Sequence, residues 1–178
     1  MKSCLSLVTA VCLTMGGAAT AATDTGEQFM KTLQSMCGQR FEGALSYAID
    51  PNNPYVGQKM STEIVCTPTS VRLPVAVGAD LSRTWIFTRT AAGLDLRHDH
   101  RHPDGSPEAV TMYGGLASDG GSALSQSFLA DGITFKLFPG SETNRWTVSF
   151  SDDRSVLTYH LDRHAKPRIE FVMRRVAP

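Results

Sequence analysis

The sequence predicts an all-β protein, an antiparallel meander of about eight to ten strands that closes into a single barrel behind a short N-terminal helix. Three observations predict this fold. Apolar and polar residues alternate along several segments, which is typical of antiparallel strands with one buried face. Short connections that carry Gly, Asp, Asn or Pro separate most of these segments and favour hairpins. A helical pattern is seen at the start, ahead of the strands.

The composition is that of a globular protein. Apolar residues make up 42% of the 178 residues and charged residues 19%, which excludes an intrinsically disordered chain. The 17 Lys and Arg residues balance the 17 Asp and Glu residues, so net charge indicates no anionic partner. Basic and aromatic residues are not interleaved, and we therefore expect no binding to nucleic acid.

Residues 1–21 have the pattern of a secretory signal peptide. Lys2 supplies the positive charge, Leu5–Met15 form a short apolar run, and Ala19-Thr20-Ala21 fits the cleavage pattern. The apolar run is shorter than the roughly 20 residues of a membrane-spanning helix. We therefore expect export to the periplasm or beyond the cell, with residues 22–178 forming one soluble domain.

Two cysteines remain after the predicted signal peptide. Cys4 and Cys12 lie within it, whereas Cys37 and Cys66 lie in the mature chain. Two thiols in an oxidising compartment usually form one disulfide. A redox or metal-binding pair is the alternative, but no C-x-x-C spacing favours it. The sequence therefore predicts a Cys37–Cys66 disulfide.

The first element of the mature chain is predicted to be a helix. Asp24 and Glu27 form a variant of the capping box, in which each side chain satisfies a backbone N–H at the helix start. Phe29 and Leu33 share one face at helical spacing, and Gly38 ends the element as a C-cap.

All later elements are predicted to be strands. The first covers 41–49, and the turn-rich residues 50–55 that follow cannot form regular structure. The glycine-rich segment 114–122 is expected to be a flexible connection. The further predicted strands are 60–66, 69–77, 84–89, 94–102, 108–113, 124–129, 132–138, 145–150, 155–162 and 168–176.

This architecture resembles that of lipocalin-like, or calycin, barrels. The features that carry the resemblance are the short N-terminal helix, the Phe41-Glu42-Gly43 start of the first strand, a long first loop at 50–59, and the run of hairpins. The resemblance implies one closed barrel over most of the mature chain.

Aromatic residues dominate the predicted inner face of the barrel. They are Phe41, Tyr47, Trp85, Phe87, Phe135, Trp146, Phe150, Tyr159 and Phe171. Such side chains either fill the core or line a pocket, and a barrel of about eight strands can do either. Our first hypothesis is a pocket for a small apolar or amphipathic ligand. The expected ligand-binding residues are Tyr47, Trp85, Phe87, His98, Trp146 and Tyr159.

A second hypothesis concerns the histidine-rich strand 94–102. Alternation places His98, His100 and His102 on one face, and the following strand can bring Glu108 beside them. Three imidazoles and one carboxylate suit a divalent ion of zinc, iron, manganese or nickel. The opposite face is predicted to be solvated and carries Asp95, Arg97, Asp99 and Arg101. The alternative is a set of ordinary hydrogen-bonded or solvated histidines at a hairpin tip.

The same segment partly resembles the first motif of cupins, which combines a glycine, H-x-H, a glutamate and another glycine. The corresponding residues here are Gly93, His100, His102, Glu108 and Gly115. The resemblance implies a metal-dependent enzyme. No G-x-S-x-G, P-loop, G-x-G-x-x-G or H-E-x-x-H motif occurs in the chain, so we expect a binding protein rather than an enzyme.

A third hypothesis is an envelope interaction protein without a pocket. It would use exposed loops or the basic residues of the last two predicted strands, which are Arg163, Lys166, Arg168, Arg174 and Arg175. The oligomeric state cannot be inferred from the sequence.

Overall fold

The computed structural model describes residues 24–177, and the predicted signal peptide, residues 1–21, lies outside them. The described chain contains two helices and one sheet of eleven strands. The elements are α1 (Thr25–Ser35), β1 (Arg40–Ala48), β2 (Lys59–Glu63), β3 (Val65–Cys66), β4 (Ser70–Val77), β5 (Asp80–Thr90), β6 (Gly93–His100), β7 (Tyr113–Leu116), β8 (Ser125–Leu129), α2 (Gly132–Leu137), β9 (Arg145–Phe150), β10 (Val156–Arg163) and β11 (Lys166–Arg175). Neither helix has the length and apolar character needed to cross a bilayer.

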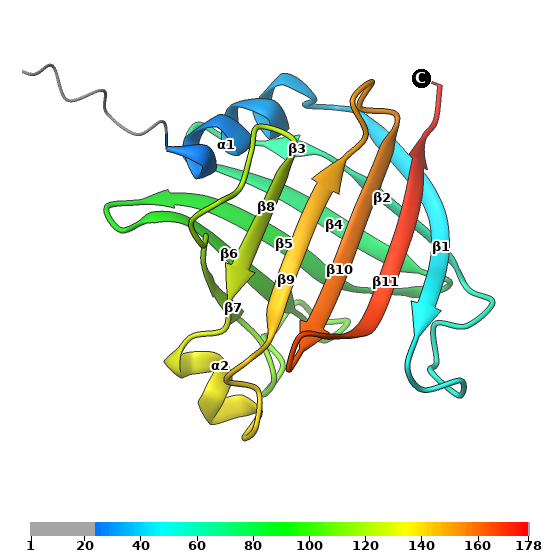
Figure 1. The fold of residues 1–178 in the computed structure, drawn as a ribbon. Coiled ribbons are helices and arrows are strands. Elements are labelled where there is room, and N and C mark those ends of the chain that lie inside the picture. Colours follow the sequence, from blue (N-terminus) through cyan, green and yellow to red (C-terminus); the bar gives the residue numbers. More distant parts are fainter. Residues whose placement is uncertain (1–23, 178) are drawn as a thin grey trace, which may run out of the picture.

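The sheet is antiparallel and curls into a nearly closed barrel (Figure 1). Its strand order is β7-β6-β5-β4-β2-β1-β11-β10-β9-β8, with β3 paired to β4, so β1 joins the two halves of the meander through β11. Beyond the paired strands, Ala117 forms a bridge with Phe128, and the Ser118 N–H donates to the Ser127 carbonyl at 2.8 Å. These contacts form a seam between the edge strands β7 and β8. The predicted antiparallel barrel with a short N-terminal helix is therefore confirmed.

Helix α1 covers one end of the barrel (Figure 1). Asp24 caps it, with Oδ1 accepting the Glu27 N–H at 3.2 Å, as the capping pattern predicts. The buried face of α1 includes Phe29 and Leu33, which have no exposed surface. The predicted disulfide between Cys37 and Cys66 is present, with a Cα–Cα distance of 5.7 Å, and it links the end of α1 to β3.

An aromatic cluster fills the half of the barrel next to α1. The Phe29 ring centroid lies 6.2 Å from that of Phe87 and 6.2 Å from that of Phe150. Phe87 also packs edge-on against Phe128 at 5.7 Å, and Phe41 packs against Phe150 at 6.0 Å. Ring separations of this size are those of favourable aromatic pairs. This half of the barrel is therefore a packed core, and any pocket must lie in the other half.

The predicted strand 132–138 is wrong, because this segment forms helix α2. Asp131 Oδ1 accepts the backbone N–H groups of Ile133 and Thr134 at 3.0 and 3.1 Å, which satisfies the first donors of the helix. The alternation of apolar residues in this segment fitted a strand, but Ile133 is about half exposed and packs in no barrel wall. Phe135, expected on the inner face, lies on α2 instead.

The predicted strand 108–113 is displaced along the chain. Strand β7 begins at Tyr113, the last residue of the predicted strand, and continues to Leu116 in the segment expected to be a glycine-rich loop. A Cβ atom on Gly114 would collide with the Leu96 carbonyl, and one on Gly115 with the Leu129 carbonyl. Glycine at these positions therefore allows β7 to lie close to β6 and to the end of β8.

Candidate functional site

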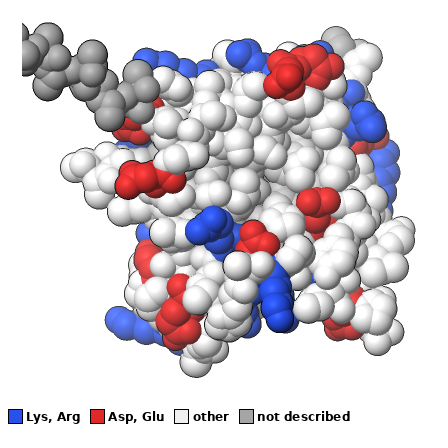
Figure 2. Space-filling view, viewed as in Figure 1, with Lys and Arg blue, Asp and Glu red and all other residues white. Residues whose placement is uncertain are grey.

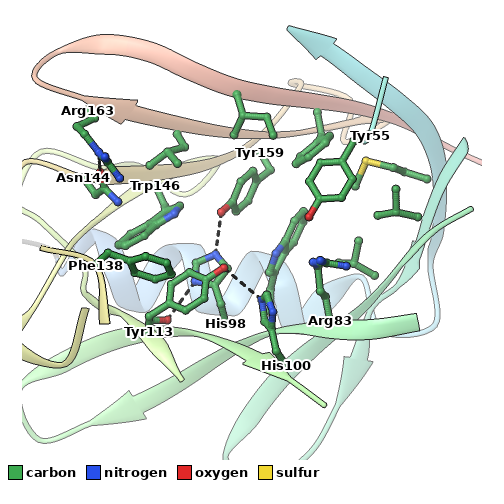
Figure 3. A pocket seen from close by; sticks show the side chains of 17 residues that line it. Tyr55, Arg83, His98, His100, Tyr113, Phe138, Asn144, Trp146, Tyr159 and Arg163 are labelled. Atoms are coloured by element: carbon green, nitrogen blue, oxygen red, sulfur yellow. Dashed lines mark hydrogen bonds between the residues drawn. The ribbon is translucent and has the colours of Figure 1, made fainter. Parts of the chain in front are cut away.

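A cavity of about 220 Å³ lies in the half of the barrel opposite α1 (Figure 3). Its lining is mostly aromatic or aliphatic: Tyr55, Met60, Val75, Val77, Trp85, Tyr113, Phe138, Trp146, Tyr159, Leu161, Ile169 and Phe171. Five polar residues complete it: Arg83, His98, His100, Asn144 and Arg163. They come from both halves of the meander, so the cavity exists only once β1 and β11 have paired.

Two stacked ring pairs form the inner wall of the cavity. The rings of Trp85 and Tyr159 lie 4.3 Å apart with an interplanar angle of 9°. His98 stacks on Tyr113 at 4.6 Å and 8°. Trp146 lies 5.2 Å from His98 and 6.1 Å from Tyr113, and the edge-on contact of His98 with Tyr159 at 5.8 Å links the two pairs. Flat rings packed in this way give the cavity a rigid apolar surface.

His98 is buried and its two ring nitrogens are both hydrogen-bonded. Nδ1 lies 3.1 Å from the Tyr113 carbonyl oxygen, and Nε2 lies 2.8 Å from the Tyr159 hydroxyl. A carbonyl oxygen only accepts, so the neutral ring carries its proton on Nδ1, and Tyr159 donates to Nε2. Burial lowers the pKa of His98 to about 3 and raises the pKa of Tyr159 well above its ordinary value. Both groups are therefore neutral at pH 7.

His100 lies nearer the open end of the cavity. Its Nε2 is 3.2 Å from the Tyr113 hydroxyl oxygen, and its Nδ1 is 3.9 Å from Oε2 of Glu108. Burial, followed by the nearby Arg83 guanidinium, lowers the pKa of His100, although Glu108 acts in the opposite direction. Burial raises the pKa of Tyr113 to about 12. These two residues therefore present a neutral hydrogen-bonded pair to the cavity.

The four predicted metal ligands are not brought together. Between residues 24 and 177, no group of three His, Cys, Asp or Glu side chains is arranged to hold one ion. His102 is exposed, because β6 ends at His100 and the chain then turns, with the His102 N–H donating to the Ser106 carbonyl at 2.9 Å. Strand alternation therefore does not extend to His102, and the cupin-like arrangement is not formed.

Two of the predicted ligand-binding residues lie outside the cavity. Tyr47 is 43% exposed, because the pairing of β1 with β11 shifts register between Leu45 and Tyr47 and turns the tyrosine outward. Phe87 packs in the core beneath α1. The other four, which are Trp85, His98, Trp146 and Tyr159, all line the cavity.

Of the four residues predicted to be solvated on the face opposite the histidines, only Arg101 is exposed. Asp95 and Asp99 are both buried. Arg97 Nε lies 2.7 Å from Asp95, and its Nη1 lies 2.7 Å from Asp131 at the start of α2. Arg101 Nε lies 2.9 Å from Asp99. The Arg97–Asp131 pair holds the start of α2 against β6, and the Thr111 hydroxyl of the following loop donates to Asp99 Oδ1 at 3.2 Å, which explains why the carboxylates are covered.

Two arginines lie at opposite sides of the open end (Figure 3). Arg83 pairs with Asp80, and its guanidinium lies over the ring of Tyr55 at 5.3 Å from the centroid. Arg163 Nε donates to Oδ1 of Asn144 at 2.7 Å. The sequence patterns indicate neither Tyr55, Arg83 nor Asn144 as a site residue, and they suggest Arg163 only for a basic outer surface. Tyr55 and Asn144 lie in loops and Arg163 ends β10, where alternation carries no signal about which side chains converge. Arg83 lies within β5, two residues before Trp85 and on the same face, so alternation could have placed it in the cavity.

The surface over β8–β11 carries charges of both signs (Figure 2). Acidic and basic side chains are dispersed around a broad uncharged area on this face. On the same strands His160 pairs with Asp162 at 3.0 Å and with Glu170 at 3.1 Å. This face therefore lacks the single-sign patch that a basic interaction surface would need.

Comparison with known proteins gives no family: no family model matches the chain, and no curated protein matches it significantly.

Proposed function

We propose that the protein binds a small amphipathic molecule in the cavity, with the apolar part of the ligand against the stacked rings. One observation supports this proposal: a barrel with one end packed by α1 and the aromatic cluster keeps about 220 Å³ open at the other end. Packed protein interiors leave few voids much larger than a water molecule. A cavity lined mainly by apolar side chains with a few polar groups is the usual form of a small-molecule site.

The volume sets the size of the ligand. A cavity of about 150 Å³ lined by apolar side chains is known to hold benzene, so this one suits a molecule of about ten non-hydrogen atoms. A single aromatic ring with a short chain, or a medium-length aliphatic chain, has that size. A long-chain lipid exceeds it, and we expect such a lipid to bind poorly.

The polar groups set the orientation of the ligand. Deep in the cavity, both His98 nitrogens and the Tyr159 hydroxyl already have partners. A polar ligand group placed there would lose hydrogen bonds to water and find no free nitrogen on His98 to replace them. The apolar end of the ligand therefore lies inward, and its polar end lies near Arg83 and Arg163 at the opening. Both His98 ring nitrogens already form hydrogen bonds, so we propose that the protein binds its ligand rather than converts it.

The proposal includes export to an oxidising compartment. The Cys37–Cys66 disulfide supports it, since such bonds persist in the periplasm or outside the cell. A lipocalin-like role, in which a secreted barrel carries a small ligand, is the form of binding protein that we propose.

Isothermal titration calorimetry with 3-phenylpropanol and hexadecanol tests the proposal. We expect the phenylpropanol to bind and the hexadecanol to bind at least tenfold more weakly. Val77→Phe adds a ring inside the cavity and should weaken phenylpropanol binding at least tenfold, whereas Val56→Phe at an exposed position should leave it unchanged. No binding of either probe or of 3-phenylpropanoate, or equal effects of the two substitutions, would overturn the proposal.

A further inference from the structure

We infer that Arg163 and Asn144 form a carboxylate receptor, so that the ligand is a small apolar carboxylic acid. The inference rests on the proposed function, because both residues line the same cavity. It adds the chemical class of the ligand and the position of its head group.

Arg163 lines the cavity as a cation without a carboxylate partner among residues 24–177. Its Nε donates to Asn144, and no Asp or Glu of the described chain lies within ion-pair distance. Other partly buried arginines do have such partners: Arg83 pairs with Asp80, and Arg97 pairs with Asp95 and Asp131. The Nη groups of Arg163 therefore remain available to an anion that enters from outside.

Asn144 is oriented by the same contact. Its Oδ1 accepts from Arg163, which leaves the amide NH₂ as the end that can donate. The residue is only 5% exposed, and its backbone is fixed by bonds from Ala130 N–H and to the Ser141 carbonyl. The amide nitrogen makes no hydrogen bond to any residue of the described chain, so a ligand oxygen would supply the missing acceptor.

The two residues together suit a carboxylate better than a neutral group. Figure 3 shows Arg163 and Asn144 side by side at one end of the cavity, next to Trp146. A carboxylate offers two oxygens, one for the guanidinium and one for the amide, and charge-assisted bonds of this kind are about twice as strong as neutral ones. No Asp or Glu lines the cavity, so nothing there repels an anion or attracts an amine. The apolar body of the acid then extends along Trp146 toward the stacked rings.

The test compares 3-phenylpropanoate with 3-phenylpropanamide, which has the same size but no charge, by calorimetry at pH 7. We expect the acid to bind at least tenfold more tightly. Asn144→Asp keeps the side-chain shape but neutralises Arg163, and it should remove the preference for the acid while changing amide affinity less than threefold. Arg163→Gln should have the same effect, and it is the alternative variant for this test if Asn144→Asp does not fold. Arg145→Gln, which removes an exposed charge outside the cavity, should keep the preference.

The possible results separate the inference from the proposed function. Equal binding of acid and amide, or an unchanged preference in both Asn144→Asp and Arg163→Gln, would overturn the carboxylate receptor but leave a binding cavity. Loss of the preference in Arg145→Gln would show that net charge alone is responsible, and would overturn it too. If neither the acid, the amide nor 3-phenylpropanol binds, the proposed function itself fails.

Discussion

His98 Nε2 and the hydroxyl oxygen of Tyr159 lie 2.8 Å apart, and their hydrogen bond joins β6 to β10 across the inside of the barrel. No sheet ladder connects these two strands, which belong to different halves of the meander. The bond therefore holds the two walls at the distance that keeps the cavity open. It also restrains the Trp85–Tyr159 stack, because a change of the Tyr159 χ1 angle would move the hydroxyl away from its acceptor.

The first prediction concerns acid stability. Burial lowers the pKa of His98 in the folded protein to about 3, whereas the unfolded chain keeps the ordinary value of 6.5. As pH falls below that value the unfolded state binds the proton first, so the contribution of His98 to stability is complete above about pH 6.5 and is lost between there and about pH 3. Between about pH 6.5 and 5 the loss is about 1.5 kcal/mol.

Urea unfolding of the wild type and of His98→Gln measures this contribution. Glutamine cannot titrate, but it can still accept from Tyr159 and donate to the Tyr113 carbonyl. Between about pH 6.5 and 5, the unfolding free energy of His98→Gln should therefore fall by about 1.5 kcal/mol less than that of the wild type. Equal pH dependence of the two proteins would show that His98 has an ordinary pKa in the fold.

The second prediction separates buried and exposed tyrosines. Tyr159→Phe removes the donor to His98 Nε2 and leaves a buried acceptor without a partner, which should cost about 1–3 kcal/mol of unfolding free energy. Tyr47→Phe removes the same atom from a residue that is 43% exposed, and should change stability by less than about 0.5 kcal/mol. Chemical denaturation compares the two variants directly. Similar costs for both would contradict the role assigned to the His98–Tyr159 bond.

The third prediction concerns the disulfide, which joins residues 29 positions apart. The double substitution Cys37→Ala/Cys66→Ala should lower the unfolding free energy by about 3–4 kcal/mol, because the unfolded chain regains the entropy that the closed loop removes. The far-UV circular dichroism should still be that of a β protein at low temperature, since α1 also packs through its own apolar face. Loss of the β signal in this variant would show that the barrel depends on the covalent link.

The barrel could be predicted from the sequence because alternation is a local property. In β9 every second residue is buried, as Trp146 and Val148 show, and the first half of β10 follows the same pattern with Leu157 and Tyr159. The prediction failed where another local interaction decided the conformation. Asp131 caps a helix whose apolar spacing also fits a strand, and the bulge in β1 reverses the direction of Tyr47.

The candidate site could be predicted only in part, for a related reason. Trp85, His98, Trp146 and Tyr159 lie within strands, so their inward direction follows from alternation. Asn144 and Arg163 are 19 residues apart and meet at the ends of β9 and β10. Their contact depends on the register between two strands and on how far each strand extends, which no single segment determines.

The last prediction tests the seam that closes the barrel. Gly115→Ala would place a Cβ atom against the Leu129 carbonyl, so β7 and the end of β8 would have to separate, at a cost of about 2–3 kcal/mol. Gly132→Ala is a matched control, since nothing lies near its Cβ position at the start of α2, and alanine there should stabilise the fold by about 0.4–1 kcal/mol.

Gly115→Ala should also affect the cavity. Tyr113 lies two residues from Gly115 on β7 and contributes both a stacked ring and the carbonyl that holds His98. Hydrogen exchange at the Ser118 amide, which donates to Ser127 across the seam, should speed up in Gly115→Ala but not in Gly132→Ala. Phenylpropanol affinity should fall in parallel, because a displaced β7 moves one wall of the cavity. Faster exchange with unchanged affinity would show that the cavity does not depend on closure of the barrel at this seam.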